Sequence, residues 1–161
     1  MVTLAPTTDG IAADLREECA AMQQFLTLLQ DEQECLLRGN ADAVSAQIAR
    51  KSGWLQKLAG LAERRRAFLQ SQRCATDRRG MDGWLATHPE AAVLAGAWHA
   101  LLKLTHQANQ ANQANGALIA TRLQSNQQAL SALAAAARSG NLYGKDGQAV
   151  GLWGSRRLGA A

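Results

Sequence analysis

The chain has 161 residues, which is enough for one domain whose core needs neither disulfides nor a structural metal. Alanine, leucine and glutamine dominate the composition and only 4% of the residues are aromatic, which is typical of long helices rather than of a sheet. The formal net charge of +4 is mild, so the composition argues against a dedicated nucleic-acid-binding protein. We therefore expect an all-α fold.

The three cysteines, Cys19, Cys35 and Cys74, lie far apart and form no C-x-x-C motif. This usage fits a reducing compartment in which the thiols serve as small apolar core side chains. The N-terminus lacks the basic and apolar regions of a signal peptide, and no segment approaches about 18 uninterrupted apolar residues. The sequence predicts a cytoplasmic protein with no direct membrane insertion.

Two helices are predicted over about residues 8–38 and 42–73. Between them Gly39 is a helix stop and Asn40 or Asp42 a cap, and so short a connection forces the two helices to be antiparallel neighbours. The first helix has an apolar seam in steps of three or four residues: Leu15, Cys19, Met22, Leu26, Leu29, Gln33 and Leu36.

The second helix carries two neighbouring stripes. The predicted main seam consists of Val44, Ile48, Lys51, Leu55, Leu58, Ala62, Arg65 and Leu69. The other stripe, in steps of seven, consists of Trp54, Leu61 and Phe68. Arg65 also belongs to a basic cluster with Arg64 and Arg66, which we interpret as a solvated face from which Arg65 reaches out along its apolar stem.

After a connection with at most a short helix around residues 81–87, a third long helix is predicted from Pro89 to about Arg138. Asn115-Gly116 is a turn signal, and a break there would give four helices. The spacing favours one helix, because steps of three or four residues continue across the glycine: Leu94, Trp98, Leu101, Thr105, Ala108, Asn112, Asn115, Ile119, Arg122, Asn126, Leu130, Leu133 and Ala137. We expect an elongated antiparallel bundle, or coiled coil, of three long helices.

The bundle domain is assigned to residues 1–138 and a flexible, glycine-rich tail to residues 139–161. A third helix of about 50 residues would overhang partners of about 30 by roughly 30 Å, which leaves an apolar strip uncovered. Such a strip either self-associates or receives an amphipathic helix of another protein. Trp84 and Trp153 lie in irregular segments and are candidates for contact with another protein, whereas Trp54 and Trp98 fit core positions.

Catalytic chemistry has little support in the sequence. It contains no nucleophile-elbow, phosphate-loop or zinc-protease motif. His99 and His106 are seven residues apart, about 10 Å along a helix, which is too far for the two to share one metal ion. We therefore expect no enzyme activity, no cofactor and no metal.

The most specific signal is the order of three motifs near the C-terminus. They are N-x-x-N-G-x-L-I over Asn112–Ile119, N-Q-Q-A-L over Asn126–Leu130, and L-Y-G-x-D-G-Q over Leu142–Gln148. Together with the helical runs over Leu26–Val44 and Lys51–Leu69, they resemble FlgN-type flagellar export chaperones over nearly the whole chain.

The resemblance implies a cytoplasmic chaperone of the flagellar type III export system. It would bind the C-terminal helices of FlgK-like and FlgL-like hook-filament junction proteins, prevent their premature assembly and deliver them to the export gate protein FlhA. The expected substrate contacts are Leu118, Ile119, Leu123, Leu130 and Leu133. The expected gate-docking residues are Leu142, Tyr143 and Gly144.

Some alternatives stay open at this level. Leu130 and Leu133 fit a core as well as a substrate contact, and the protein fits either a monomer or a dimer. Nucleic acid is not an expected partner, because the net charge is weak. The alternative function is that of a self-associating structural coiled-coil protein without an export role.

Overall fold

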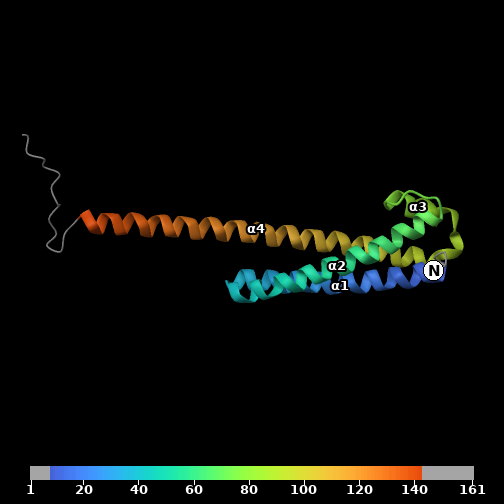
Figure 1. Ribbon diagram of the computed structural model, residues 1–161, viewed down its shortest axis with the longest axis horizontal. Coiled ribbons are helices and arrows are strands. Elements are labelled where there is room, and N and C mark those ends of the chain that lie inside the picture. Colours follow the sequence, from blue (N-terminus) through green and yellow to red (C-terminus); the bar gives the residue numbers. More distant parts are fainter. Residues whose placement is uncertain (1–7, 143–161) are drawn as a thin grey trace, which may run out of the picture. The chain divides into compact units, whose positions relative to one another are not determined.

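The computed structural model describes the backbone of residues 8–142 and the side chains of residues 9–138. This part of the chain is helical, with no strand (Figure 1). Its elements are α1 (Thr8–Arg38), α2 (Ala41–Ser71), α3 (Arg78–Thr87), the 3-10 turn η1 (Pro89–Ala91) and α4 (Ala92–Leu142). The predicted all-α class with three long helices is confirmed.

The chain divides into two compact units, Met1–Ile119 and Ala120–Ala161, and α4 contributes residues to both. The first unit contains α1, α2, α3 and the first half of α4. All the buried side chains of the described residues belong to it. The core of the protein is therefore a property of the first unit.

Local turn chemistry produces the α1–α2 hairpin. Gly39 takes a left-handed conformation (φ 75°), and the backbone N–H of Asn40 donates to the Cys35 carbonyl at 3.0 Å. The Asn40 side chain then accepts a hydrogen bond from the Ala43 N–H at 3.1 Å and caps α2. The predicted stop at Gly39 and cap at Asn40 are both confirmed.

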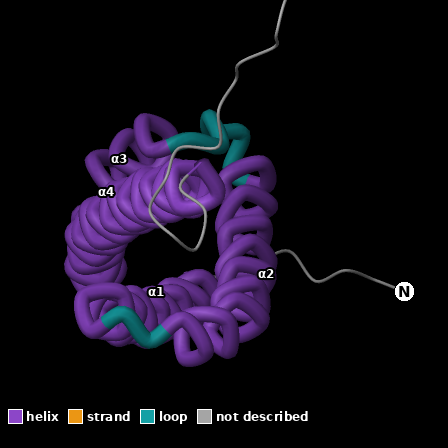
Figure 2. The backbone as a smooth tube through the Cα atoms, turned by 90° about the vertical axis from the view of Figure 1, so that its left-hand side faces the viewer, coloured by secondary structure: helices purple, strands orange, loops and turns teal. Residues whose placement is uncertain are grey.

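The first half of α4 runs parallel to α1. The Cys19 thiol donates to the Ala97 carbonyl at 3.3 Å, and the Asn115 side chain donates to the Leu29 carbonyl at 2.8 Å. Because residue numbers rise together in the two pairs, both helices point in the same direction. Seen nearly end-on, α1 and α2 lie next to each other (Figure 2).

Two clusters of buried apolar side chains hold the first unit together. The cluster that joins all four α-helices contains Ile11, Leu15, Phe68, Leu69, Met81, Trp84, Leu94, Trp98 and Leu101. The cluster that joins α1, α2 and α4 contains Ala21, Phe25, Leu26, Leu28, Leu29, Leu58, Leu61 and Ala108.

α2 buries members of both predicted stripes, Leu58 with Leu69 of the main seam and Leu61 with Phe68 of the other, so the main seam is wrong only where its members face solvent. Leu69 is fully buried, but Leu55 and Ile48 are 51% and 63% exposed. A strict seven-residue repeat drifts by about 20° per heptad around a straight helix. The seam that meets the core at Leu69 has therefore turned toward solvent at Ile48.

α3 begins at Arg78, earlier than the short helix predicted around residues 81–87. The Asp77 carboxylate caps it by accepting a hydrogen bond from the Gly80 N–H at 3.0 Å. A side chain at residue 80 would collide with the Ala75 carbonyl, so this glycine permits the close approach of the preceding loop.

Trp84 is buried, so the prediction that it contacts another protein is wrong. Only 5% of its surface is exposed, and its ring packs edge-on against Phe68 with 5.1 Å between centroids. Its indole N–H donates to Gln72 Oε1 at 3.4 Å. α3 therefore folds back on the end of α2, where Phe68 and the C-cap residue Gln72 lie. Trp153, the other tryptophan in this prediction, lies outside the described residues.

α4 passes through Asn115-Gly116 without a break, as the spacing predicts. Pro89 lies in η1 rather than in the first turn of the α-helix. Residues 139–142, predicted to belong to the tail, are helical, and the rest of that tail lies outside the described residues. No helix within residues 8–142 is long and apolar enough to span a membrane.

Candidate protein-binding site

Arg65 lies inside the bundle rather than on a solvated face, so the interpretation from the sequence is wrong. Its guanidinium donates two hydrogen bonds to the Glu18 carboxylate, both at 3.1 Å, and only 16% of the Arg65 side chain is exposed. The guanidinium also lies 5.1 Å from the centre of the Trp98 ring, close enough for a cation–π contact. Arg65 thus connects α2 to α1 through the bidentate pair with Glu18 and to α4 through Trp98.

The other arginines of the cluster are paired on the surface. Arg64 contacts Asp14 at 3.1 Å and Glu17 at 3.4 Å, and Arg66 contacts Glu63 at 3.1 Å. The hydrogen bond that Arg64 donates to Asp14, together with the charges of the Asp14 and Glu17 carboxylates, raises the pKa of Arg64. Because each arginine already has a carboxylate partner, the cluster is not a ready site for an external anion.

A second polar connection joins the same three helices near the other end of α1. Lys51 contacts the Glu32 carboxylate at 2.9 Å, and the Asn115 side chain donates to the same carboxylate at 2.7 Å. Asn115 is 1% exposed, and its carbonyl Oδ1 has no hydrogen-bond partner among the described residues. The buried amide therefore fixes the position of α4 along α1 through its two donated bonds.

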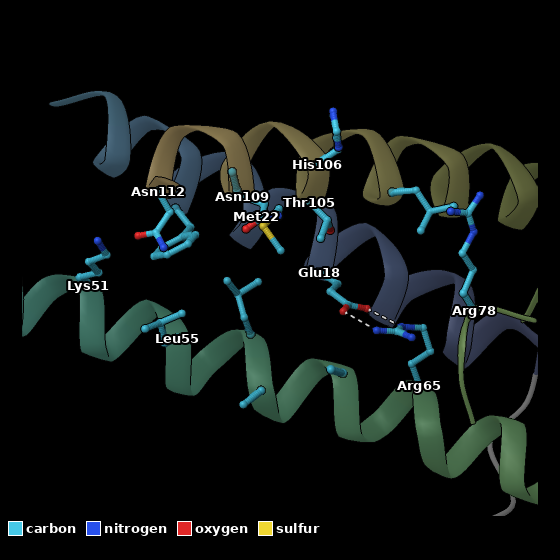
Figure 3. A pocket seen from close by; sticks show the side chains of 16 residues that line it. Glu18, Met22, Lys51, Leu55, Arg65, Arg78, Thr105, His106, Asn109 and Asn112 are labelled. Carbon is cyan, nitrogen blue, oxygen red and sulfur yellow. Dashed lines mark hydrogen bonds and ion pairs between the residues drawn. The ribbon is translucent and has the colours of Figure 1, made fainter. Parts of the chain in front are cut away.

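Between these two polar connections lies a groove of about 760 Å³. α2 and α4 form its walls, and α1 lies behind them (Figure 3). The side chains that line this α2–α4 groove are Glu18, Met22, Phe25, Lys51, Leu55, Leu58, Ala59, Ala62, Arg65, Arg78, Leu102, Thr105, His106, Ala108, Asn109 and Asn112.

The lining of the groove is apolar along its floor and along α2, and polar but uncharged along much of α4. Met22 and Phe25 belong to the floor, while Leu55 and Ala59 belong to the α2 wall. The charged groups Lys51 and Arg65 are held by carboxylates of α1. Such a lining suits an amphipathic helix with a leucine-rich face and amide-rich flanks.

A second apolar surface lies on the C-terminal half of α4. Every side chain from Ile119 to Arg138 is exposed. Steps of four and three residues place one set of these side chains on a single helix face, which we call the exposed seam: Ile119, Leu123, Asn126, Leu130 and Leu133. Its apolar members are 46% to 67% exposed. Scattered apolar residues are common on surfaces, whereas a regular seam makes this face a candidate for binding.

The structure places most of the predicted substrate-contact residues on this seam. Ile119, Leu123, Leu130 and Leu133 are exposed, so none of them belongs to the core of the described chain. Leu118 is half-buried. Leu142, Tyr143 and Gly144, predicted to dock at the export gate, lie outside the residues whose side chains are described.

The α2–α4 groove was not predicted from the sequence. Two signals were available, because Lys51 and Arg65 occupy positions of a predicted apolar seam. A long charged side chain at such a position requires a partner, and both partners are carboxylates of α1. The opening between α2 and α4 has no comparable signature in the sequence.

The described residues contain no cluster of histidine, cysteine, aspartate or glutamate that could hold a metal ion. Cys19, Cys35 and Cys74 are half-buried and form no disulfide. Burial, and to a smaller extent the nearby Glu18 carboxylate, raise the pKa of the Cys19 thiol. These side chains contribute to packing, and the two apolar surfaces are the features that remain for a partner.

Comparison with known proteins gives one match. The family model described as FlgN protein matches residues 1–151. No curated protein and no solved structure matches the chain. The family match covers both apolar surfaces, all four α-helices and the beginning of the tail. The chain therefore belongs to the FlgN family of flagellar export chaperones.

Proposed function

We propose that this protein binds the C-terminal helices of FlgK-like and FlgL-like hook-filament junction proteins in the cytoplasm, prevents their premature assembly and delivers them to the export gate. The observation that carries this proposal is the exposed seam of α4. It presents large apolar side chains on a regular helix, which is the surface that an amphipathic helix of a partner recognises.

The energetics of the seam suit a chaperone. Covering one exposed leucine contributes up to about 1.5–3 kcal/mol, and the seam offers Leu123, Leu130 and Leu133 together with Ile119. Ordering the partner helix opposes part of this gain, so the net affinity is moderate. A chaperone must release its substrate at the gate, which moderate affinity allows.

The delivery step is assigned to the segment after α4. Tyr143 and Gly144 lie there, directly after Leu142 at the end of α4, and the resemblance of this motif to FlgN-type chaperones makes Tyr143 the proposed anchor for FlhA. Tyr143→Ala should remove binding to the FlhA-like gate protein and preserve binding of junction-protein helices. A pull-down with the gate protein, run beside the peptide titration below, separates the two activities.

The proposal is tested by titrating the purified protein with C-terminal peptides of the FlgK-like and FlgL-like proteins from the same organism. Leu130→Asp places a charge in the exposed seam and should lower peptide affinity about tenfold or more, because apolar anchors dominate such interfaces. Gln128→Asp introduces the same charge on the opposite face of α4 and serves as the matched control. Circular dichroism should show that both variants keep their helical content.

Binding of both peptides, lost in Leu130→Asp and kept in Gln128→Asp, is the expected result. An equal loss of peptide affinity in both variants would mean that the substrate does not bind at the exposed seam. If neither peptide binds the wild-type protein, the chaperone assignment to these substrates fails, and a self-associating structural coiled coil becomes the better description.

A further inference from the structure

The chain contains two apolar surfaces that complement each other. One is the α2–α4 groove, which is concave, and the other is the exposed seam, which lies on the outside of a single helix. The groove extends from Lys51 to Arg65, roughly 20 Å along α2 at 1.5 Å per residue. The exposed seam from Ile119 to Leu133 is about 20 Å long by the same measure, so its length matches that of the groove.

The chemistry of the two surfaces also matches. Leu123, Leu130 and Leu133 would meet the apolar groove floor formed by Met22 and Phe25. Small side chains lie on both surfaces: Ala59 and Ala62 in the groove wall, and several alanines between residues 129 and 137 of α4. Alanines allow two helices to approach each other closely.

Polar groups are matched as well. The segment from residue 119 to 138 contains no aspartate or glutamate and two arginines, Arg122 and Arg138, and its other polar side chains are amides and hydroxyls. The α4 wall of the groove presents Thr105, Asn109 and Asn112, which can exchange hydrogen bonds with amides such as Asn126 and Gln127. In the groove, Lys51 and Arg65 are already paired with carboxylates of α1, so docking the uncharged side chains of the seam over them strands neither charge.

The occupant that these observations favour is a second copy of the same chain. Filling the groove with the segment of its own chain would require α4 to break between Asn112 and Leu123, and α4 is one uninterrupted helix from Ala92 to Leu142. Two copies can satisfy both surfaces of each other, and a reciprocal exchange of this kind has two-fold symmetry.

The area buried by such an exchange is sufficient for a dimer. A helix about 10 Å wide, half-buried over about 20 Å in each of two grooves, removes about 1,300 Å² in total when the matching groove surfaces are included. This value lies at the lower end of the range of specific interfaces, about 1,200–2,000 Å². The expected dimer is specific but readily dissociated.

We propose that the unloaded protein forms a reciprocal dimer in which the exposed seam of each copy lies in the α2–α4 groove of the other. This inference rests on the proposed function in one respect: the seam that we assign to the substrate helix is then covered until substrate arrives. Substrate and second copy compete for the same leucines, so loading converts the dimer into a one-to-one complex.

The test begins with the mass of the full-length protein in solution, measured by light scattering during gel filtration over a range of concentrations. The wild-type protein should approach twice the monomer mass of 17.2 kDa and dissociate on dilution. Leu55→Asp should remain a monomer, because Leu55 lines the groove and is already 51% exposed, so the substitution spares the core. Ile48→Asp, seven residues earlier on α2, 63% exposed and outside the groove, should behave as wild type.

Mixing two defective variants identifies the reciprocal geometry. Leu55→Asp keeps an intact seam and Leu130→Asp keeps an intact groove, so each alone should be monomeric. An equimolar mixture regains one of the two contacts and should form a heterodimer weaker than the wild-type dimer. A dimer held by pairing of two α4 seams would instead survive Leu55→Asp and gain nothing from mixing.

Peptide titration separates this inference from the proposed function. If both are right, the apparent peptide affinity of the wild-type protein falls as protein concentration rises, and Leu55→Asp binds peptide equally at all concentrations. A monomeric wild-type protein that binds peptide overturns the dimer and leaves the chaperone function intact. Loss of peptide binding in Leu55→Asp also overturns it, because the groove would then hold the substrate helix. A dimer that binds no peptide refutes the proposed function alone.

Discussion

Two stretches of α4, before and after Asn115-Gly116, carry the same residue spacing but have different surroundings. In the first, residues 94–115, five side chains of one face are at most 5% exposed: Leu94, Trp98, Leu101, Ala108 and Asn115. In the second, residues 119–133, the apolar side chains of the corresponding face are 46% to 67% exposed. Spacing determines which residues share a face of a helix, whereas burial depends on what covers that face.

The two stretches also differ in chemistry. The first carries Trp98 and Asn115, whose side chains have specific partners on the other helices. The second is built from leucine, alanine and amides, which pack against many helical surfaces. The first stretch is therefore suited to one permanent set of neighbours, and the second to a partner that binds and leaves.

The two stretches should differ most in how much their surroundings contribute to the stability of the fold. Phe68→Ala should lower the free energy of unfolding by about 4 kcal/mol, because it opens a cavity at a site that is 1% exposed in the core around the first stretch. Leu133→Ala should change it by less than about 0.5 kcal/mol in the monomer, since that side chain is 67% exposed. Urea unfolding followed by tryptophan fluorescence measures both. A comparable loss in the two variants would mean that the second stretch is covered in the free monomer.

The Glu18–Arg65 pair should give the next largest effect. Arg65→Met leaves the Glu18 carboxylate buried without its partner and should lower the free energy of unfolding by about 3 kcal/mol. Adding Glu18→Gln removes the stranded charge and should recover part of the loss. Arg66→Met is the matched control on the same helix, where an exposed pair with Glu63 contributes little. If Arg65→Met and Arg66→Met behave alike, the Glu18–Arg65 pair does not hold the three helices together.

A smaller contrast separates two asparagines of α4. Asn115→Ala removes the hydrogen bonds to the Leu29 carbonyl and the Glu32 carboxylate and should lower the free energy of unfolding by about 2 kcal/mol. Asn126→Ala, in the exposed seam, should leave the monomer as stable as wild type or slightly more so, because alanine is the better helix former. Equal values for the two variants, again from urea unfolding, would contradict the structural role of the buried amide.

The sequence predicted the features that depend on local chemistry. Gly39 and Asn40 located the turn between α1 and α2, because a left-handed glycine and a capping side chain act within a few residues. The continuity of α4 through Gly116 followed from the spacing on either side of it. The sequence could not decide whether Leu130 and Leu133 belong to the core or to a substrate contact, because their exposure depends on which helices cover α4.

Features that depend on the register between helices could not be predicted. Arg65 belonged to a predicted seam, but its partner Glu18 depends on how α1 and α2 align along their length. Trp84 was a candidate for contact with another protein because its segment looked irregular, and its burial depends on α3 folding back on α2. The groove likewise depends on the separation of α2 and α4, which is set by the packing of both against α1.

The smallest expected effect is a pH dependence at the contact between α1 and α4. Burial raises the pKa of the Cys19 thiol above the ordinary value of 9.0, so the folded state holds this proton more tightly than the unfolded state. The resulting stabilisation is fully present below about pH 9 and is lost as pH rises through the raised pKa. The difference in unfolding free energy between the wild-type protein and Cys19→Ala should therefore shrink as pH rises from neutral to strongly alkaline values. A difference that stays constant or grows would show that the Cys19 thiolate is tolerated where the thiol donates to the Ala97 carbonyl.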